Sequence, residues 1–514
     1  MNFINYTLPF IDNYNLELLR TFYGSSLGPY GHLKSITNAG GNSIVSSSSL
    51  KIISTVEFED PSCHSIAETI KEFVKYFRGG GLTLGTLISD LLLVRNEIRG
   101  FDYAVHIFPI LESIKIPFEI GSLNHLQSYI RSTLTSKKWL LISKEAESLE
   151  NALIEAFLKS IPDEEDDHFS SSFVDIEVKS KSGKYFSSVY NGYLYSLSHI
   201  YQPQIKALKS GDTIRSVALN ILLDDDISKV SQLSDLKVKD VSYNPFQKPY
   251  EYAIRIAQEC NRLGVNVIAN QKVMSQSIID YFQDSCNIFV LDRLGTKGIH
   301  SFSKLSNSKI CTSAQINEDD IGILDGVEIE LIGQSLYLRC WSETRPLITL
   351  FVGQVFEDAS DELQDMCRNI LFDLRSISLQ SSPFILPGAG CTESKIFACL
   401  SSMNKSIIPV ANVFRRLALR LTGEKNACID KTHHHLWVNP YKNCQCGLLL
   451  HSNSTELVPI QENEFRKEKN QVDRTNYRSC IPSVIDSFHL KRKIIETAFE
   501  RQESFSSIEL TIVL

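Results

Sequence analysis

Residues 28–34 read Gly28-Pro29-Tyr30-Gly31-His32-Leu33-Lys34, and a second short stretch follows, Thr37-Asn38-Ala39-Gly40-Gly41. Their proline, asparagine and glycine content predicts two tight turns. Glycine lets backbone N–H groups approach a phosphate closely, and the N-terminus of a helix favours anions. A plain structural turn explains the same residues, so each stretch alone is weak support for a phosphate site.

Two further glycine stretches lie at the starts of predicted helices. Gly79-Gly80-Gly81 separates one apolar helical pattern from the next, and Gly388-Ala389-Gly390 stands directly before Cys391-Thr392-Glu393 at the start of another. Gly79-Gly80-Gly81 is a common way to end a helix, whereas Gly388-Ala389-Gly390 opens a helix and has the chemistry of a phosphate-binding turn. Their order along the chain is therefore more informative than any one of them.

The rest of the chain divides into helical flanks and a mixed middle. Apolar residues at helical spacing predict helices over about 61–78, 82–94, 122–135 and 144–160, and again through 363–377 and 484–499. Strands are predicted between them at 265–269, 288–291, 327–332, 336–338 and 347–352, and at the end at 508–514. Alternating strands and helices in the middle are typical of an α/β unit with some parallel pairing.

Composition excludes several classes of protein. Of the 514 residues, 43% are hydrophobic and 22% are charged, and these fractions exclude a largely disordered chain. The net charge of -8 argues against a dedicated nucleic-acid binder. Twelve cysteines without a dense framework predict reduced thiols in a cytosolic protein. No apolar stretch approaches the roughly 18 residues that a membrane helix needs. His433-His434-His435 with Cys444 and Cys446 match no common zinc spacing, so no metal site is predicted.

On these motifs the chain resembles the group II chaperonin family, the cytosolic TCP-1 type. That family reads Gly-Pro-x-Gly-x-x-Lys, then Thr-Asn-Asp-Gly, then Gly-Asp-Gly-Thr-Thr and, much later, Gly-Gly-Gly before a helix. Residues 28–34 fit the first element, and residues 37–40 fit the second except for its aspartate. The resemblance spans the chain and implies a multidomain fold of three nested domains. These are a mostly α equatorial domain (1–122 and 396–514), a small α/β intermediate domain (123–190 and 351–395) and an α/β apical domain (191–350).

The departures from the family pattern concern ATP hydrolysis. Residues 79–83 lack the aspartate that in the family holds the magnesium bridging the phosphates, position 39 is alanine, and no late catalytic aspartate is found near residues 423–430. The resemblance thus implies ATP with Mg²⁺ as ligands but weak or lost hydrolysis. The rate of hydrolysis would be lower by on the order of 10³-fold or more. No catalytic residue is assigned. The nucleotide-binding residues that it implies are Gly28, Pro29, Gly31, Thr37, Asn38, Gly40, Gly79, Gly80, Gly81, Gly388 and Gly390.

Within the family, the chain is similar to the chaperonin-like proteins of McKusick–Kaufman and Bardet–Biedl syndromes, through residues 130–137, 390–393, 435–437 and 444–448. This implies a chaperone that assists BBSome assembly and ciliogenesis in the cytoplasm, at the centrosome or ciliary basal body. The implied partners are other Bardet–Biedl chaperonin-like proteins, the TCP-1 ring complex and BBSome subunits, with no nucleic acid and no membrane insertion.

In the family, apolar side chains of the apical domain hold non-native proteins. The candidate surfaces here are the helix with Ile278, Ile279, Tyr281 and Phe282 and the loop 299–312, although an apolar helical stripe more often packs in a core. Two other functions stay open. One is an active ATP-driven folding machine that takes its aspartates from other positions, such as Asp90 or Asp430. The other is a passive centrosomal scaffold.

Overall fold

The computed structural model describes residues 6–9, 12–28, 31–37, 43–56, 58–137, 143–161, 174–197, 214–223, 247–333, 335–421, 448–450, 457–459, 484–508 and 510–513. The chain forms two compact units. The first comprises Met1–Phe157, Ser180–Phe186 and Val352–Leu514, and the second comprises Leu158–Lys179 and Ser187–Phe351. Both chain ends belong to the first unit, so the second is an insertion, as a nested arrangement requires. The predicted boundaries of three domains stay a prediction.

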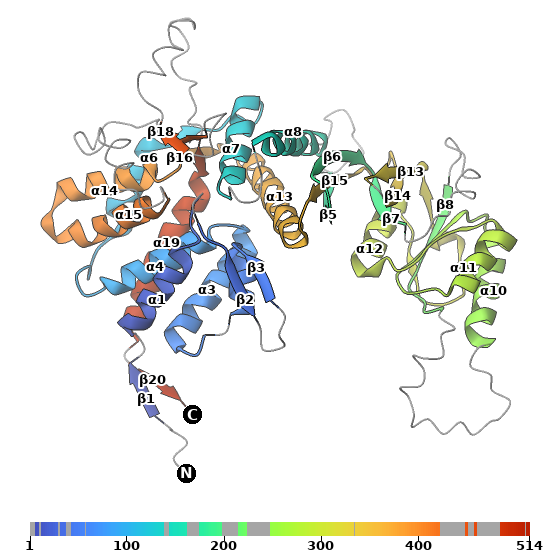
Figure 1. The fold of residues 1–514 in the computed structure, drawn as a ribbon, viewed down its shortest axis with the longest axis horizontal. Helices are drawn as coiled ribbons and strands as arrows, with labels where there is room; N and C mark the ends of the chain where they lie inside the picture. Colours follow the sequence, from blue (N-terminus) through green and yellow to red (C-terminus); the bar gives the residue numbers. More distant parts are fainter. Residues whose placement is uncertain are drawn as a thin grey trace, which may run out of the picture. The chain divides into compact units, whose positions relative to one another are not determined.

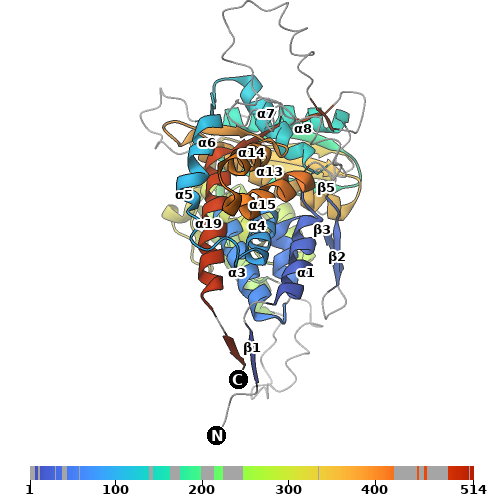
Figure 2. The same ribbon diagram turned by 90° about the vertical axis from the view of Figure 1, so that its left-hand side faces the viewer.

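The first unit is a bundle of helices around one apolar core (Figures 1 and 2). α4 packs against α1, α3, α15 and α19. α3 begins where the sequence predicts, because the Asp60 carboxylate accepts a hydrogen bond from the Cys63 N–H at 2.9 Å and Pro61 is the first helical residue. The main helices of this bundle are α1 (Asn13–Gly24), α3 (Pro61–Phe77), α4 (Gly81–Leu93), α14 (Cys391–Met403), α15 (Ile408–Leu421) and α19 (Phe488–Ser506).

The first unit also contains short paired strands and further helices. β1 (Tyr6–Pro9) pairs antiparallel with β20 (Leu510–Val513), which joins the two ends of the chain and confirms the predicted terminal strand. β2 (Lys34–Thr37) and β3 (Ser43–Ser46) form a hairpin, and β16 (Phe384–Pro387) lies between β4 (Ile116–Pro117) and β19 (Ile485–Ser487). β17 (Leu448–Leu450) pairs with β18 (Leu457–Pro459). The remaining helices include α2 (Ser49–Thr55), α5 (Tyr103–His106), α6 (Phe108–Ile114), α7 (Leu123–Thr135), α8 (Ser143–Lys159) and α13 (Glu357–Ser378).

The second unit is an α/β structure, as the alternating pattern predicts. Its main sheet has the order β10 (Phe289–Leu291), β9 (Val267–Asn270), β8 (Ile214–Leu219) and β11 (Ile310–Cys311), all parallel, and β12 (Ile321–Leu324) pairs antiparallel with β8. Successive strand residues serve two cores: Ile268 packs in one cluster with α10 (Gln247–Arg262), and Val267 in another with α12 (Gly295–Ser306). Helices therefore cover both faces of this sheet.

Two three-stranded sheets complete the described strands. The predicted hairpin is confirmed as β13 (Gly326–Ile332) and β14 (Ser335–Trp341), with β7 (Tyr193–Ser196) on the other edge of β14. β15 (Leu347–Gln354) lies between β5 (Asp175–Ser182) and β6 (Phe186–Asn191), and it is buried along its whole length. The chain passes from one unit to the other within each of these three strands and also within α8.

Candidate functional site

Two glycine turns that are far apart in the sequence contact the same helical turn of α15. A Cβ atom at Gly28 would lie 2.9 Å from the carbonyl oxygen of Leu421, and one at Gly390 would lie 3.1 Å from that of Ala418. The first distance is shorter than real Cβ contacts and the second is tight, and the two glycines have φ of +71° and +82°, so backbone and packing alone favour glycine at each position. The structure thus brings together the first and the last predicted phosphate turns.

The first turn is closed by its own hydrogen bonds. The Gly31 N–H donates to the carbonyl oxygen of Gly28 at 3.0 Å, and the Ser26 hydroxyl donates to the carbonyl oxygen of His32 at 2.8 Å. Lys34 donates to the Ser25 hydroxyl at 2.6 Å, and partial burial lowers the pKa of this lysine. Thr37 lies at the exposed end of β2. Pro29, Asn38 and Gly40, which the sequence places in the same site, lie outside the described residues.

The turn before α14 is equally well connected. The Gly388 N–H donates to the carbonyl oxygen of Val484 at 2.8 Å, and the Thr392 hydroxyl donates to that of Pro387 at 2.8 Å. Glu393, in the first turn of the helix, is buried and pairs with Lys491 at 2.6 Å. The carboxylate of Glu393 therefore already supplies a negative charge near this helix N-terminus.

The third glycine stretch has different surroundings. Gly80 adopts φ +78° just before α4, and a Cβ atom there would lie 2.6 Å from Cδ1 of Ile494 on α19. The resemblance expects a magnesium-binding aspartate in this stretch. An aspartate at position 80 would need both a left-handed backbone and the space that Ile494 fills. Gly79 differs, because a Cβ atom there would lie 3.7 Å from Leu490, an ordinary contact. The residues present do not fit a magnesium ion at position 80.

Asp90 is the centre of a buried charge cluster. Only 1% of its side chain is exposed, and one carboxylate oxygen accepts from Arg416 Nε at 3.1 Å while the other accepts from Arg420 at 3.1 Å. Arg20 lies 3.7 Å from the first oxygen. The cluster joins α1 and α4 to α15, the helix that both glycine turns contact. Asp430, the other proposed source of a catalytic carboxylate, lies outside the described residues.

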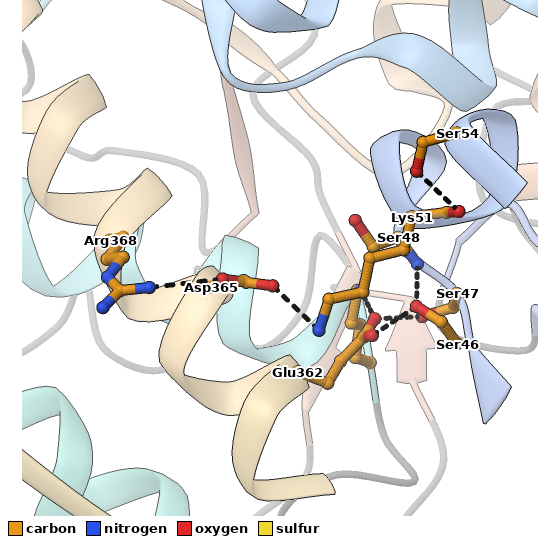
Figure 3. A network of polar contacts seen from close by, with 9 residues as sticks. Ser46, Ser47, Ser48, Lys51, Ser54, Glu362, Asp365 and Arg368 are labelled. Atoms are coloured by element: carbon orange, nitrogen blue, oxygen red, sulfur yellow. Dashed lines mark hydrogen bonds and ion pairs between the residues drawn. The ribbon is translucent and has the colours of Figure 1, made fainter. Parts of the chain in front are cut away.

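Sequence reasoning missed a second buried carboxylate, Glu362 of α13. Figure 3 shows that Glu362 lies against Ser46 and Ser47, at the end of β3, with Lys51 and Asp365 beside them. Ser46 precedes Glu362 by 316 residues. No local pattern links such distant positions, although the unusual run Ser46-Ser47-Ser48-Ser49 could have drawn attention to one half of the site.

The predicted client-binding residues are buried in the second unit. Ile278, Ile279 and Phe282 are 0%, 8% and 0% exposed, and all three pack in the apolar cluster beneath α10. This corrects the expectation that they present apolar surface, because the helical stripe faces the sheet. Beside them the aromatic surface is made by tyrosines. Tyr250 is 43% exposed, and its ring centroid lies 5.6 Å from that of Tyr281.

The part of the chain that the structure describes contains no group of three or more His, Cys, Asp or Glu side chains placed to hold a metal ion. None of its helices is both long enough and apolar enough to cross a bilayer. All eight described cysteines are free thiols, and seven of them are buried.

The comparisons with known proteins agree with this architecture. A family model described as the TCP-1/cpn60 chaperonin family matches residues 19–505. The chain is 23% identical over 402 residues to "Molecular chaperone MKKS" of Pongo abelii, a match that covers 74% of this chain and 69% of that protein, and the Homo sapiens protein of the same name matches 399 residues at 23%. It is 24% identical over 405 residues to "Thermosome subunit gamma" of Saccharolobus shibatae, covering 74% and 72%. The resemblance seen in the sequence is confirmed.

Proposed function

The chain belongs to the TCP-1/cpn60 chaperonin family, and we propose that it is a chaperonin-like chaperone that binds client subunits without efficient ATP hydrolysis. Relatives named as a molecular chaperone and as thermosome subunits support the first half of this proposal. The family typically works in oligomeric complexes, so other chaperonin-like chains are its natural partners. The proposed lack of efficient ATP hydrolysis depends on the glycine stretch before α4.

The observation that carries the loss of hydrolysis is the packing around Gly80. Phosphoryl transfer depends on a metal ion that is held in place and neutralises developing charge. At position 80 there is no carboxylate, and Ile494 fills the space into which a side chain would project. A metal ligand there would need a residue that adopts the left-handed backbone and a shift of the Ile494 side chain on α19. The packing around Gly80 therefore disfavours the return of that ligand.

Asp90 weighs against the alternative of an active folding machine. Both oxygens of Asp90 accept from arginines, so its negative charge is already compensated within the fold and is less available to a magnesium ion. The Lys34 ammonium, which follows the first glycine turn, is likewise engaged by Ser25. Nucleotide could still contact the backbone of the glycine turns, more weakly than in an active chaperonin.

We place the client surface on the tyrosines of the second unit. Tyr250 and Tyr252 on α10 are 43% and 40% exposed, and Tyr281 stands beside Tyr250. Tyrosine offers a large apolar ring with a polar tip, and it suits contacts with varied apolar segments. The buried Ile278, Ile279 and Phe282 support this surface from below and do not need to touch the client.

For the clients themselves we propose subunits of the BBSome, handed on together with other Bardet–Biedl chaperonin-like proteins and the TCP-1 ring complex at the centrosome or ciliary base. The resemblance in residues 390–393 and the similarity to proteins named MKKS support this assignment. A net charge of -8 over the chain suits protein partners better than nucleic acid.

Affinity purification of the tagged full chain from ciliated cells, followed by mass spectrometry, tests this role. We expect recovery of BBSome subunits and chaperonin-like partners both with ATP and after nucleotide depletion. Recovery of fully assembled complexes alone, with no free subunits, would instead support a passive scaffold. Release of partners on ATP addition would support an active folding machine.

A further inference from the structure

One lysine of the second unit is enclosed by aromatic rings. Lys179 lies on β5, and its Nζ is 3.8 Å from the centroid of the Tyr193 ring and 5.7 Å from that of the Tyr195 ring. The two tyrosines alternate along β7, so both rings lie on the same face of that strand, with centroids 4.5 Å apart. The ammonium donates a hydrogen bond to the carbonyl oxygen of Leu194, which stands between them. The two rings and this carbonyl oxygen form the enclosure of Lys179.

The enclosure favours the neutral amine over the ammonium ion. Aromatic rings and one carbonyl oxygen replace only part of the water that solvates a cation, so burial lowers the pKa of Lys179 to about 8, although the charge of Glu177 opposes this shift. Two other ionisable groups beside it stay uncharged, because burial raises the pKa of the Cys340 thiol and of the Tyr195 hydroxyl. Roughly one in five Lys179 side chains is therefore neutral at about pH 7.4, against roughly one in a thousand for an ordinary lysine.

The hydroxyl group of Tyr195 is a second, independent observation at this place. Only 2% of Tyr195 is exposed, and its hydroxyl has no hydrogen-bond partner among the residues that the structure describes. A buried donor without an acceptor is unfavourable. An acyl group on Lys179 carries a carbonyl oxygen, which is the kind of acceptor that this hydroxyl lacks. The surroundings of Lys179 therefore suit an amide better than an ammonium ion.

We propose that Lys179 is a modification site that accepts a short activated acyl group from an acyl thioester or an acyl phosphate. The neutral amine attacks the carbonyl carbon, an amide C–N bond forms, and the C–S or C–O bond to the leaving group breaks. The thiolate or phosphate leaves with the bonding electrons, and the amine proton passes to water. Lys179 is half-buried, so the site favours short acyl chains over long ones. This inference does not rest on the proposed chaperone role, so either can fail alone.

Acetylation of the folded full chain by acetyl coenzyme A and, separately, by acetyl phosphate tests the site. Peptide mass spectrometry gives the rate at each lysine as the pH is varied. Lys184, which is exposed in the turn between β5 and β6, is the matched control. We expect Lys179 to react about 3- to 10-fold faster than Lys184 at about pH 7.4, and its rate to level off above about pH 8 while the rate at Lys184 still rises. Reaction with only one of the two reagents identifies the acyl source.

Two further measurements make the result specific to the fold. In the urea-unfolded chain the two lysines should react at the same rate, because the enclosure is lost. Tyr193→Ser opens the enclosure to water, so its Lys179 profile should move toward that of Lys184; if this variant does not fold, the wild-type profile and the urea comparison still decide. No acetylation of Lys179 by either reagent, or a rate that follows Lys184 at every pH, would overturn the proposal. A difference that survives in urea, or an unchanged profile in folded Tyr193→Ser, would overturn it as well.

Discussion

The glycine turns that contact α15 and the glycine stretch before α4 are alike in sequence but have different surroundings. Gly28 and Gly390 fit the family pattern, and each lets the chain pass close to the backbone of α15. Gly80 departs from the pattern, and the place of its missing side chain is taken by Ile494. A glycine motif can thus persist because the fold needs its backbone, even where the family's neighbouring aspartate is absent.

The largest effect is expected at Asp90. This residue pairs with arginines of α15, the helix that both family-like glycine turns contact. Asp90→Asn removes the carboxylate that pairs with Arg20, Arg416 and Arg420, and leaves three positive charges close together. The free energy of unfolding should fall by about 3–5 kcal/mol. Urea unfolding measures it, with the exposed Asp361→Asn as the control. A loss below about 1 kcal/mol would show that the cluster does not hold the bundle.

The glycine stretch before α4, which departs from the family pattern, is tested by substituting Gly80 and its neighbour Gly79. Gly80→Ala should cost about 2–4 kcal/mol, because alanine would adopt a left-handed backbone and its Cβ would overlap Ile494. Gly79→Ala is the matched control, with room for a Cβ atom, and should change stability by less than about 1 kcal/mol. Equal effects at the two positions would remove the basis for distinguishing this stretch from the other turns.

A half-buried acid on α13, Asp373, gives a smaller effect that depends on pH. Burial raises the pKa of Asp373 to about 7, and Tyr129 donates to its carboxyl group at 3.3 Å. The unfolded chain loses this proton near pH 4 and the folded chain near pH 7, so this group lowers stability as pH rises between them. Asp373→Asn should therefore stabilise the protein by about 1–3 kcal/mol at pH 8 and little at pH 4. Unfolding curves at both pH values measure this difference, with Glu357→Gln as the control. An equal change in the free energy of unfolding of Asp373→Asn at pH 4 and pH 8 would contradict the raised pKa of Asp373.

The smallest expected effect is on client binding. Tyr250→Ala should weaken the binding of a chemically unfolded model protein about 3- to 10-fold without changing stability, because one exposed ring is removed. Leu331→Ala, at a residue that is 69% exposed on β13, is the matched control and should leave binding unchanged. Light scattering of the aggregating client reports the binding. Equal loss in both variants would argue against a specific tyrosine surface.

The sequence predicts much of the fold because the relevant signals are local. Helical spacing finds α3, α4 and α13, and strict alternation finds the β13–β14 hairpin. Family motifs also place the glycine turns in order. These signals depend on neighbouring residues, so they hold without knowledge of tertiary contacts.

The rest depends on contacts that the sequence does not encode locally. An apolar stripe such as Ile278–Phe282 reads the same whether it faces a sheet or a client, and only packing decides. The pairing of Glu362 with Ser46 joins residues 316 positions apart. The effect of glycine at position 80 becomes clear only when Ile494 is seen beside it.

Steady-state ATP hydrolysis tests the central claim most directly. The purified full chain, Gly80→Asp and Gly79→Asp are compared with a thermosome assayed alongside them under the same magnesium and ATP concentrations. We predict turnover on the order of 10³-fold below the thermosome for all three proteins, with no gain in Gly80→Asp because Ile494 excludes the new carboxylate. Turnover comparable to the thermosome, or its recovery in Gly80→Asp alone, would contradict a loss of hydrolysis built into the packing of this unit.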